Sequence, residues 1–289
     1  MNTALLSDFP KTHTHDVTLF FYPSPGMDWS TPFSLVKSTV YNKLVYRRPR
    51  AIGHVSIMLR TPDSIQITGM TQEHKHEGRH EVLFHGYGLG ILTHVFQGAL
   101  ETTEQLAPEL VERAKLDGKL SYLRFDVSAE TIMRLKRFLK EYADAGGGSR
   151  YGMVPRPLYG EGSGCSAFAA AFLIHAGLMT AELENAWTRS FRIPKKFMGG
   201  PAHGKKVPFW KLLFARSWAH RDEEHVQGFF WDPDLMHSWL TKTFARERVQ
   251  PTGQNQLEYW HHSIGISRDA RNVVTPTGPV ILKDQKNVS

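Results

Sequence analysis

The sequence predicts an α+β fold in which an antiparallel sheet packs on helices. Segments such as 16–22 and 120–127 are rich in β-branched and large apolar residues, which is typical of strands. The segment 128–142 instead carries apolar residues at helical spacing. A third observation is the apolar stretch that begins at Cys165, the only cysteine of the chain. Strands and helices that are grouped, rather than regularly alternating, indicate the α+β class.

The chain is expected to begin with a strand, a helix and a hairpin. Residues 16–22 form the strand, and Thr31 caps a helix whose first turn holds Pro32. Residues 54–59 and 64–68 then form two strands that a turn connects. The histidine that opens this hairpin is therefore expected to have a neighbouring strand beside it.

Further elements lead from the hairpin to the cysteine. Residues 81–95 are expected to form a strand that several glycines interrupt, and residues 108–115 a short helix. Ser128 caps the helix that follows the strand 120–127. The helix after the cysteine ends at Gly177. Because this last helix is apolar on all sides, it is expected to lie buried inside the domain.

Cys165 has the surroundings of a reactive thiol. It follows the flexible, glycine-rich run 159–164 and stands where the apolar helix begins. Unpaired N–H groups and the positive end of the helix dipole stabilise a thiolate there, and the thiolate is the nucleophilic form. The alternative is that the cysteine is only a small buried hydrophobic residue. A single cysteine also excludes an intramolecular disulfide framework.

A catalytic thiol requires a base, and His54 is the histidine whose context favours that role. It opens the strand 54–59, and a hairpin that closes around residues 60 and 61 places it opposite Gln66. Facing residues on neighbouring strands have Cβ atoms about 5 Å apart, so the Gln66 amide is expected to orient the imidazole. The alternatives are an ordinary histidine at a strand end and a glutamine that faces solvent.

These segments resemble a known family. The run from His54 to Leu59, a turn, and a polar residue twelve positions after the histidine resemble the strand pair of NlpC-type papain-like cysteine peptidases. Gly-Cys-Ser-Ala-Phe around Cys165 is similar to their nucleophile motif, and Arg150-Tyr151-Gly152 is similar to the segment before it. Because the histidine precedes the cysteine, the similarity is to the circularly permuted branch, which includes the lecithin:retinol acyltransferase-like proteins. Gly164 and Ala167 replace the aspartate and the glycine that are usual in the motif.

The resemblance implies a circularly permuted papain-like core over residues 15–178 and a role for each site residue. Cys165 would be the nucleophile, His54 the general base and Gln66 the orienting third residue. Tyr151 would polarise the substrate carbonyl. Backbone N–H groups at the start of the helix, around Gly164 and Ser166, would stabilise the oxyanion. The resemblance implies no metal and no cofactor.

Residues 179–289 are expected to form a mainly helical, aromatic-rich extension that packs on this core. Six of the seven tryptophans of the chain lie in this part. Residues 209–218 and 235–244 have the pattern of amphipathic helices. The aromatic residues either cover one side of the core or, alternatively, form a wall of the substrate groove or a contact with a membrane surface.

Three functions are compatible with these features. The first is a cysteine hydrolase that cleaves an amide or peptide bond through an acyl-enzyme. For it, the resemblance implies a peptide, a peptidoglycan fragment or a lipid-linked amide as substrate. The second is a lipid acyltransferase or acyl hydrolase on the same scaffold, which an apolar tunnel beside Cys165 would favour. The third is a non-catalytic binding protein, in which Cys165 would be buried and out of reach of His54.

The composition is that of a globular enzyme with a basic surface. Of 289 residues, 41% are hydrophobic, which suffices for a substantial core, and the formal net charge is +7. The charge favours contact with anionic surfaces, but it is scattered and no nucleic-acid-binding motif accompanies it. No apolar run is long enough for a transmembrane segment, and residues 1–20 lack the layout of a signal peptide. The expected location is cytoplasmic for a full-length chain, or outside the cell if a leader has been removed.

Four histidines between residues 74 and 85 form the remaining motif of interest. His74, His76, His80 and His85 could gather around a metal ion, but their spacing matches no established zinc pattern. A polar, histidine-rich loop is the expected structure of this segment.

Overall fold

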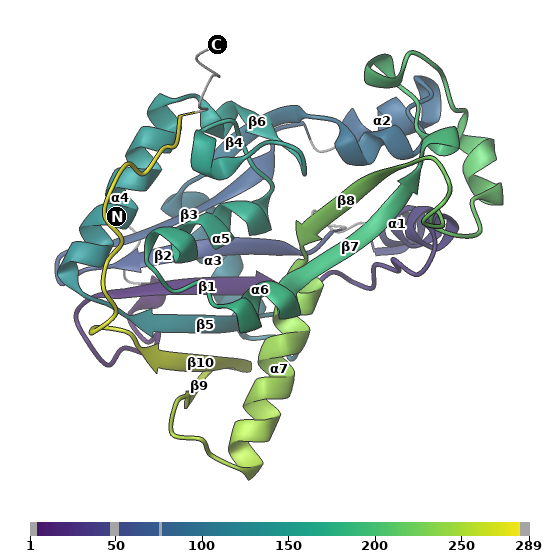
Figure 1. The fold of residues 1–289 in the computed structure, drawn as a ribbon. Coiled ribbons are helices and arrows are strands. Elements are labelled where there is room, and N and C mark those ends of the chain that lie inside the picture. Colours follow the sequence, from purple (N-terminus) through teal and green to yellow (C-terminus); the bar gives the residue numbers. More distant parts are fainter. Residues whose placement is uncertain (1–4, 47–51, 75–76, 284–289) are drawn as a thin grey trace.

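The structure is a computed structural model that describes residues 5–46, 52–74 and 77–283. These residues form a mixed α/β fold with one large, mostly antiparallel sheet and helices on both of its faces (Figure 1). The strands of this sheet are β1 (Asp16–Tyr22), β2 (His54–Arg60), β3 (Ile65–Gln72), β4 (Phe96–Glu101), β5 (Ser121–Asp126), β6 (Arg150–Tyr151), β9 (Gln256–Trp260) and β10 (Ser263–Asp269).

The order of the strands across the sheet is β6-β4-β3-β2-β1-β5-β10-β9. Neighbouring strands are antiparallel, except that β10 runs parallel to β5. The central strands β1 and β2 are buried along their whole length, as expected for strands that are covered on both faces. His54 therefore lies at the start of a strand in the middle of the sheet.

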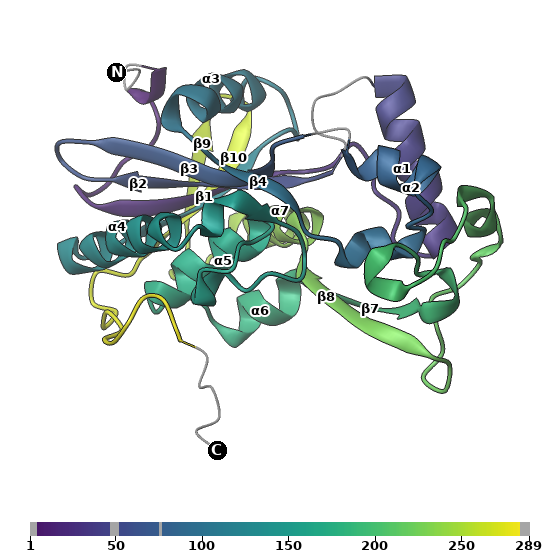
Figure 2. The same ribbon diagram turned by 90° about the horizontal axis from the view of Figure 1, so that it is seen from above.

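Helices cover both faces of the sheet (Figure 2). α3 (Thr103–Ala114) lies on one face, on the opposite side from α4 and α5. The helices whose buried residues pack on the other face are α4 (Ala129–Asp144), α5 (Cys165–His175), α6 (Ala181–Trp187) and α7 (Pro233–Val249). None of the helices in the described ranges has a stretch long and apolar enough to cross a lipid bilayer.

The alternation of side chains along β1 produces two cores. Val17, Leu19 and Phe21 are fully buried among residues of α4, α5 and α7. Phe20 and Tyr22 point to the opposite face and pack with the apolar residues of α3. Full burial of an aliphatic or aromatic side chain of this size stabilises the fold by roughly 1.5–3 kcal/mol. The sheet and its two helical layers therefore hold each other in place.

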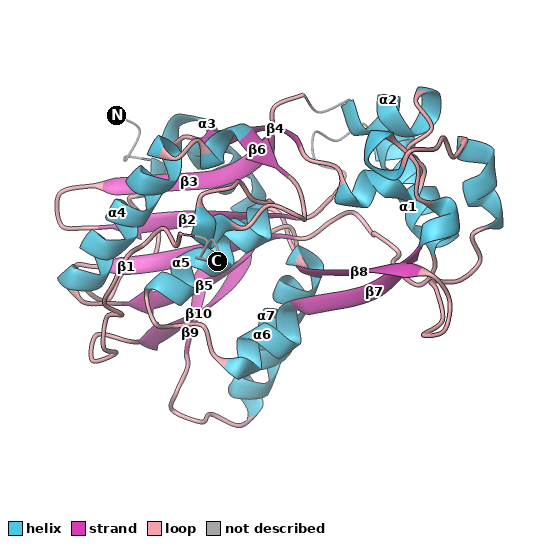
Figure 3. Ribbon diagram, turned by 45° about the horizontal axis from the view of Figure 1, so that its top comes forward, coloured by secondary structure: helices cyan, strands magenta, loops and turns pink. Residues whose placement is uncertain are grey.

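A second lobe projects from one side of the sheet (Figure 3). Its ribbon consists of the antiparallel strands β7 (Thr188–Pro194) and β8 (His225–Trp231). α1 (Pro32–Tyr46) and α2 (Glu77–Phe84) lie at the far end of this ribbon. The lobe has a small core of its own, formed by Leu89, Phe191, Ile193, Met198, Val207 and Leu212. The 3₁₀ helices of the chain include η2 (Leu89–Thr93), η3 (Gly147–Ser149), η4 (Pro157–Tyr159), η5 (Lys195–Phe197), η6 (Pro201–His203) and η7 (Phe209–Phe214).

Most of the elements predicted for the first half of the chain are confirmed. The strands 16–22 and 120–127 correspond to β1 and β5, and the hairpin strands correspond to β2 and β3. Ser128 caps α4, because its hydroxyl accepts the N–H of Thr131 at 3.1 Å. α5 is buried along its length, as its apolar surface predicted.

The strand predicted over residues 81–95 is wrong. The segment begins inside α2 and continues as η2, and the strand β4 starts only after it. The side chains of Glu81 and His85 contact each other across a helical turn, with Oε2 and Nδ1 2.9 Å apart. Gly86 and Gly88 then have φ values of 70° and 51°, which an extended strand does not contain.

The prediction of a mainly helical extension over residues 179–289 is also wrong. Beside α6 and α7, the described part of this segment contributes the ribbon β7–β8 and the strands β9 and β10. Of the helix predicted over 209–218, the structure forms the shorter 3₁₀ helix η7. Amphipathic spacing could not reveal that β10 pairs with β5, because the two strands are far apart in the sequence. Residues beyond 178 thus complete the sheet that contains His54.

Candidate active site

His54 stands where β2 begins and where it separates from β3. The paired register of these two strands runs from Arg60–Ile65 to Ser56–Gly69 and ends there. β3 continues beyond this point in a pair with β4. Val55 comes just before Ser56, the β2 residue of the last pair, so its N–H is not used by β3. This N–H donates a hydrogen bond to the thiol of Cys165 instead.

Cys165 is the first residue of α5, where backbone N–H groups have no partner within the helix. Its N-cap is Gly164, which has no side chain to occupy these groups, whereas α4, α6 and α7 each begin with a side-chain cap. The thiol is hydrogen-bonded to the imidazole of His54, to the N–H of Val55 and to the side chain of Tyr151. Cys165 is 5% exposed, so these contacts lie inside the protein.

These surroundings lower the pKa of the Cys165 thiol. Burial is the largest influence and by itself raises the pKa, because a buried thiolate loses its hydration. The hydrogen bond to His54 and the charge of its imidazolium act in the opposite direction, together with the bonds to Val55 and Tyr151. The net shift of the pKa is downward. The same imidazole that can take the proton therefore also stabilises the thiolate.

Glu101, the last residue of β4, lies on the other side of the imidazole. Its Oε2 is 2.8 Å from Nε2 of His54, and both side chains are less than one-tenth exposed, at 8% and 4%. Because Nε2 faces the carboxylate, Nδ1 is the ring nitrogen left for the sulfur. A carboxylate in this position selects the tautomer of the ring and stabilises the imidazolium.

The absence of a side chain at Gly69 makes space for the contact between His54 and Glu101. Ser56, Gly69 and Glu101 are register partners on the adjacent strands β2, β3 and β4. A Cβ atom on Gly69 would lie 2.7 Å from Oε2 of Glu101 and 3.4 Å from Nε2 of His54. Any larger residue on β3 at this point would therefore displace the carboxylate, the imidazole or both.

Tyr22, the register partner of His54 on β1, packs against the imidazole. The two ring centroids are 5.4 Å apart, and the Tyr22 hydroxyl contacts the hydroxyl of Ser56 at 2.9 Å. The guanidinium carbon of Arg113, on α3, lies 5.0 Å from the centroid of the tyrosine ring. The ring that supports His54 is thus itself fixed from two sides.

The structure brings Cys165, His54 and Tyr151 together, as the sequence predicted. Gly164 and Ser166 flank the cysteine, as the N-cap and the second residue of α5.

The predicted position of Gln66 is wrong. Gln66 is the register partner of Leu59 and not of His54, because the hairpin turn comprises residues 61–64 and the first pair is Arg60 with Ile65. The Thr61 N–H donates to the carbonyl of Ser64 at 2.9 Å and closes this turn. Gln66 therefore lies toward the opposite end of the hairpin.

The sequence reasoning missed Glu101 and the gap that Gly69 provides. The pairing of β3 with β4 spans a helix and a 3₁₀ helix, so no local pattern reveals it. A weak signal exists, since Glu101 ends an apolar run and directly precedes the Thr102 cap of α3. A carboxylate at the end of a strand is a position from which a side chain can reach a site beside the sheet.

The comparison with known proteins adds no family to this geometry. No protein-family model, no curated protein and no solved structure matches the chain.

Within the described ranges, one group of side chains has the chemistry and spacing to hold a metal ion. It consists of His80, Glu81 and His85, whose potential ligand atoms all lie within 4.8 Å of one another. The segment is not the loop that the sequence predicted, because α2 contains His80 and Glu81. This group lies outside the set of contacts around Cys165.

Proposed function

We propose that this chain is a cysteine hydrolase that cleaves an amide or peptide bond through a thioester acyl-enzyme. One observation carries the proposal. The thiol of Cys165 is hydrogen-bonded to His54, and the same imidazole lies 2.8 Å from Glu101. A nucleophile, a base and a group that orients the base are the parts that covalent catalysis by cysteine requires.

In the first step, His54 takes the proton of the thiol and the thiolate attacks the carbonyl carbon of the substrate. The N–H groups at the start of α5 and the hydroxyl of Tyr151 stabilise the oxyanion that forms. His54 then protonates the leaving amine as the C–N bond breaks, and the acyl group remains on Cys165. Water attacks this thioester with His54 as general base, which releases the acid and restores the thiol.

Glu101 takes the place that was expected for Gln66. Its Oε2 lies 2.8 Å from Nε2 of His54, and this contact holds Nδ1 toward the sulfur. Its negative charge also stabilises the imidazolium that each proton transfer creates. Glu101 is a positioning residue in this scheme, because it acts on the substrate only through His54.

The proposal includes a circularly permuted papain-like core. It is supported by the order of the parts along the chain, with a histidine strand before a cysteine helix, and by the packing of α5 against the antiparallel sheet. The substrate class that follows from the resemblance is a cell-wall peptide or a related amide. The contact between Cys165 and His54 supports this hypothesis over a non-catalytic protein, for which the two side chains would be expected to lie apart.

The test is the rate at which iodoacetamide labels the single thiol across pH. We expect wild-type Cys165 to label at neutral pH faster than an equally buried thiol with an ordinary pKa would, because the pKa of Cys165 is lowered. In His54→Ala the burial remains and the stabilising bond is lost, so the pKa rises and neutral labelling slows by about tenfold or more. Glu101→Gln should also slow the labelling of Cys165 at neutral pH.

The matched control is Gln66→Ala, which removes a polar side chain from the same hairpin without touching the thiol site. Its labelling profile should equal that of the wild type. Hydrolysis of peptide amides by the purified chain, and its loss in Cys165→Ser, completes the test. If His54→Ala and the wild type have the same pH profile of labelling, the proposal is contradicted.

A further inference from the structure

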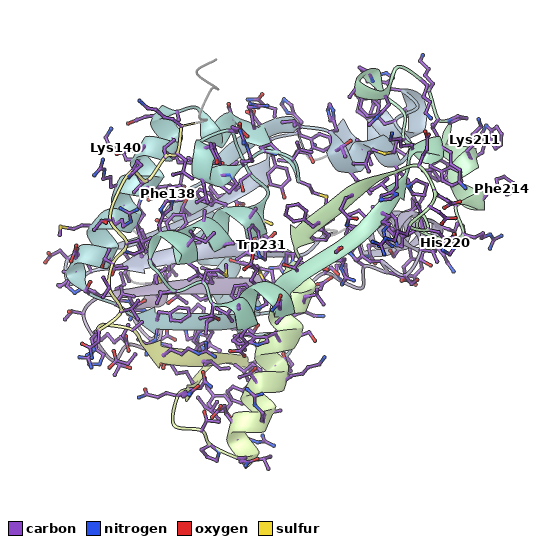
Figure 4. The ribbon with its side chains drawn as sticks, in the orientation of Figure 1. Phe138, Lys140, Lys211, Phe214, His220 and Trp231 are labelled. Atoms are coloured by element: carbon purple, nitrogen blue, oxygen red, sulfur yellow. The ribbon has the colours of Figure 1, made fainter. Side chains whose placement is uncertain are left out.

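The far end of the second lobe presents an apolar tip. We define the aromatic tip as Trp210, Leu213 and Phe214, all on η7, with exposed fractions of 57%, 43% and 66%. Lys211 and Phe214 lie at the outer margin of the molecule and point away from it (Figure 4). Large apolar side chains that gather on one exposed turn indicate a contact surface.

The 3₁₀ geometry of η7 explains why these residues point outward. With three residues per turn, every third side chain lies on the same ridge. Phe209 and Leu212 form the inward ridge, and Leu212 is buried in the core of the second lobe. Trp210 and Leu213 form a second ridge, beside Lys211 and Phe214. The exposure of the tip therefore follows from how the helix is anchored.

The anchors of η7 are specific contacts with α1 and the loop before it. The Phe33 N–H donates to the carbonyl of Ala215 at 3.0 Å, directly after η7. The indole N–H of Trp218 donates to the carbonyl of Trp29 at 2.8 Å. The aromatic tip is thus held outward on a packed base.

Basic residues flank the tip along the sequence up to Arg221, after which Asp222, Glu223 and Glu224 follow. Residues 195–221 contain no aspartate and no glutamate. The exposed basic residues of this stretch nearest to the tip in the sequence are Lys205, Lys206, Lys211 and Arg216. Lys211 also lies against the tip, with its Nζ 5.9 Å from the centroid of the Trp210 ring.

We propose that the aromatic tip docks this protein onto an anionic lipid bilayer. Tryptophan and phenylalanine partition into the region between headgroups and acyl chains, and lysines beside them are attracted by anionic headgroups. A second copy of the chain is a poorer occupant, because a symmetric contact through the tip would bring its lysines against each other. This inference does not rest on the proposed catalytic function.

The test is cosedimentation of the full chain with vesicles of phosphatidylcholine alone or mixed with phosphatidylglycerol. The wild type should bind the anionic vesicles and release them as salt increases. Trp210→Ser/Phe214→Ser should lower the partition coefficient about tenfold or more. Lys205→Gln/Lys206→Gln should lower it at low salt by about fivefold for each lysine. The control Val249→Ser changes a residue that is 84% exposed at the end of α7, and it should bind as the wild type does.

Two outcomes would overturn the proposal. The first is that the wild type binds neither kind of vesicle, or that the tip variant, folded by circular dichroism, binds as well as the wild type. The second is that the wild type ignores vesicles but self-associates in sedimentation equilibrium, and that Trp210→Ser/Phe214→Ser abolishes this association. That result would assign the tip to a contact between copies of the chain.

Discussion

At the scale of single residues, the contact between His54 and Glu101 depends on an absent side chain. Gly69 lies between the strands that carry the two groups, and a Cβ there would come within 2.7 Å of Oε2 of Glu101. Its φ is not in the left-handed region, so alanine at this position introduces a steric conflict without backbone strain. This makes Gly69 a direct probe of the arrangement.

We expect Gly69→Ala to slow neutral iodoacetamide labelling of Cys165 by about tenfold, because the displaced carboxylate no longer supports the imidazolium. The measurement is a double-mutant cycle with Glu101→Ala. If Gly69 acts through Glu101, the glycine substitution should have little further effect in the Glu101→Ala background. Equal, additive losses in both backgrounds would show that Gly69 acts on the site by another route.

His54 and Cys165 could be predicted from the sequence because each has a local signature. The histidine opens an apolar strand, and the cysteine follows a glycine-rich run at the head of an apolar helix. The third group of the proposed site, Glu101, could not be predicted in the same way. Its identity depends on the register of the hairpin, where a turn of residues 61–64 moves Gln66 away from the histidine. It also depends on the pairing of β3 with β4.

At the scale of elements, the packing of α4 against α5 contains a buried histidine. His175 ends α5 and lies against the ring of Phe138 on α4, with centroids 4.4 Å apart. Burial, with a smaller contribution from Arg134, lowers the pKa of His175 to about 4. The folded protein therefore holds this imidazole in its neutral form.

This depressed pKa predicts a loss of stability in acid. Below the ordinary pKa of 6.5, the unfolded chain protonates His175 while the folded chain does not until about pH 4. The free energy of unfolding should thus fall by about 3 kcal/mol between these limits, relative to a variant that lacks the histidine. Urea unfolding of the wild type and of His175→Leu from pH 7 to pH 4 measures the difference. If the free energies of unfolding of the wild type and of His175→Leu differ by the same amount from pH 7 to pH 4, the lowered pKa of His175 is contradicted.

The success of element prediction also differs along the chain. α4 was predictable because Ser128 and a regular apolar stripe mark its start and its buried face. The segment 81–95 was not, because its apolar residues serve two short helical turns that are shaped by positive φ at Gly86 and Gly88. Local spacing is informative only where one element is long enough to show its period.

At the scale of the whole molecule, a buried network of charges crosses the sheet from β2 to β9. Asp16 Oδ2 lies 3.3 Å from Nε of Arg60, and the Thr18 hydroxyl donates to the other carboxylate oxygen at 3.0 Å. Further along, Arg124 is paired with Asp126 and Glu258. The network connects the first strand of the chain with strands from its end.

Burial, which Arg60 and Arg124 offset only in part, raises the pKa of Asp16 to about 6. The folded protein thus binds this proton more tightly than the unfolded chain does. The free energy of unfolding of the wild type, relative to Asp16→Asn, should fall as pH rises from about 4 to about 6, by roughly 3 kcal/mol. Paired denaturant titrations at these pH values measure it. A relative stability that increases with pH would mean that the ion pair with Arg60 outweighs burial.

The parallel pair of β5 and β10 has a consequence for how the chain is made. The ribosome synthesises β5 long before β10, because α4, α5, the ribbon β7–β8 and α7 lie between them in the sequence. During that interval the nascent chain carries an open strand edge, which is a template for wrong pairing. A prematurely terminated product that ends before Ser263 keeps that edge open and is therefore expected to aggregate.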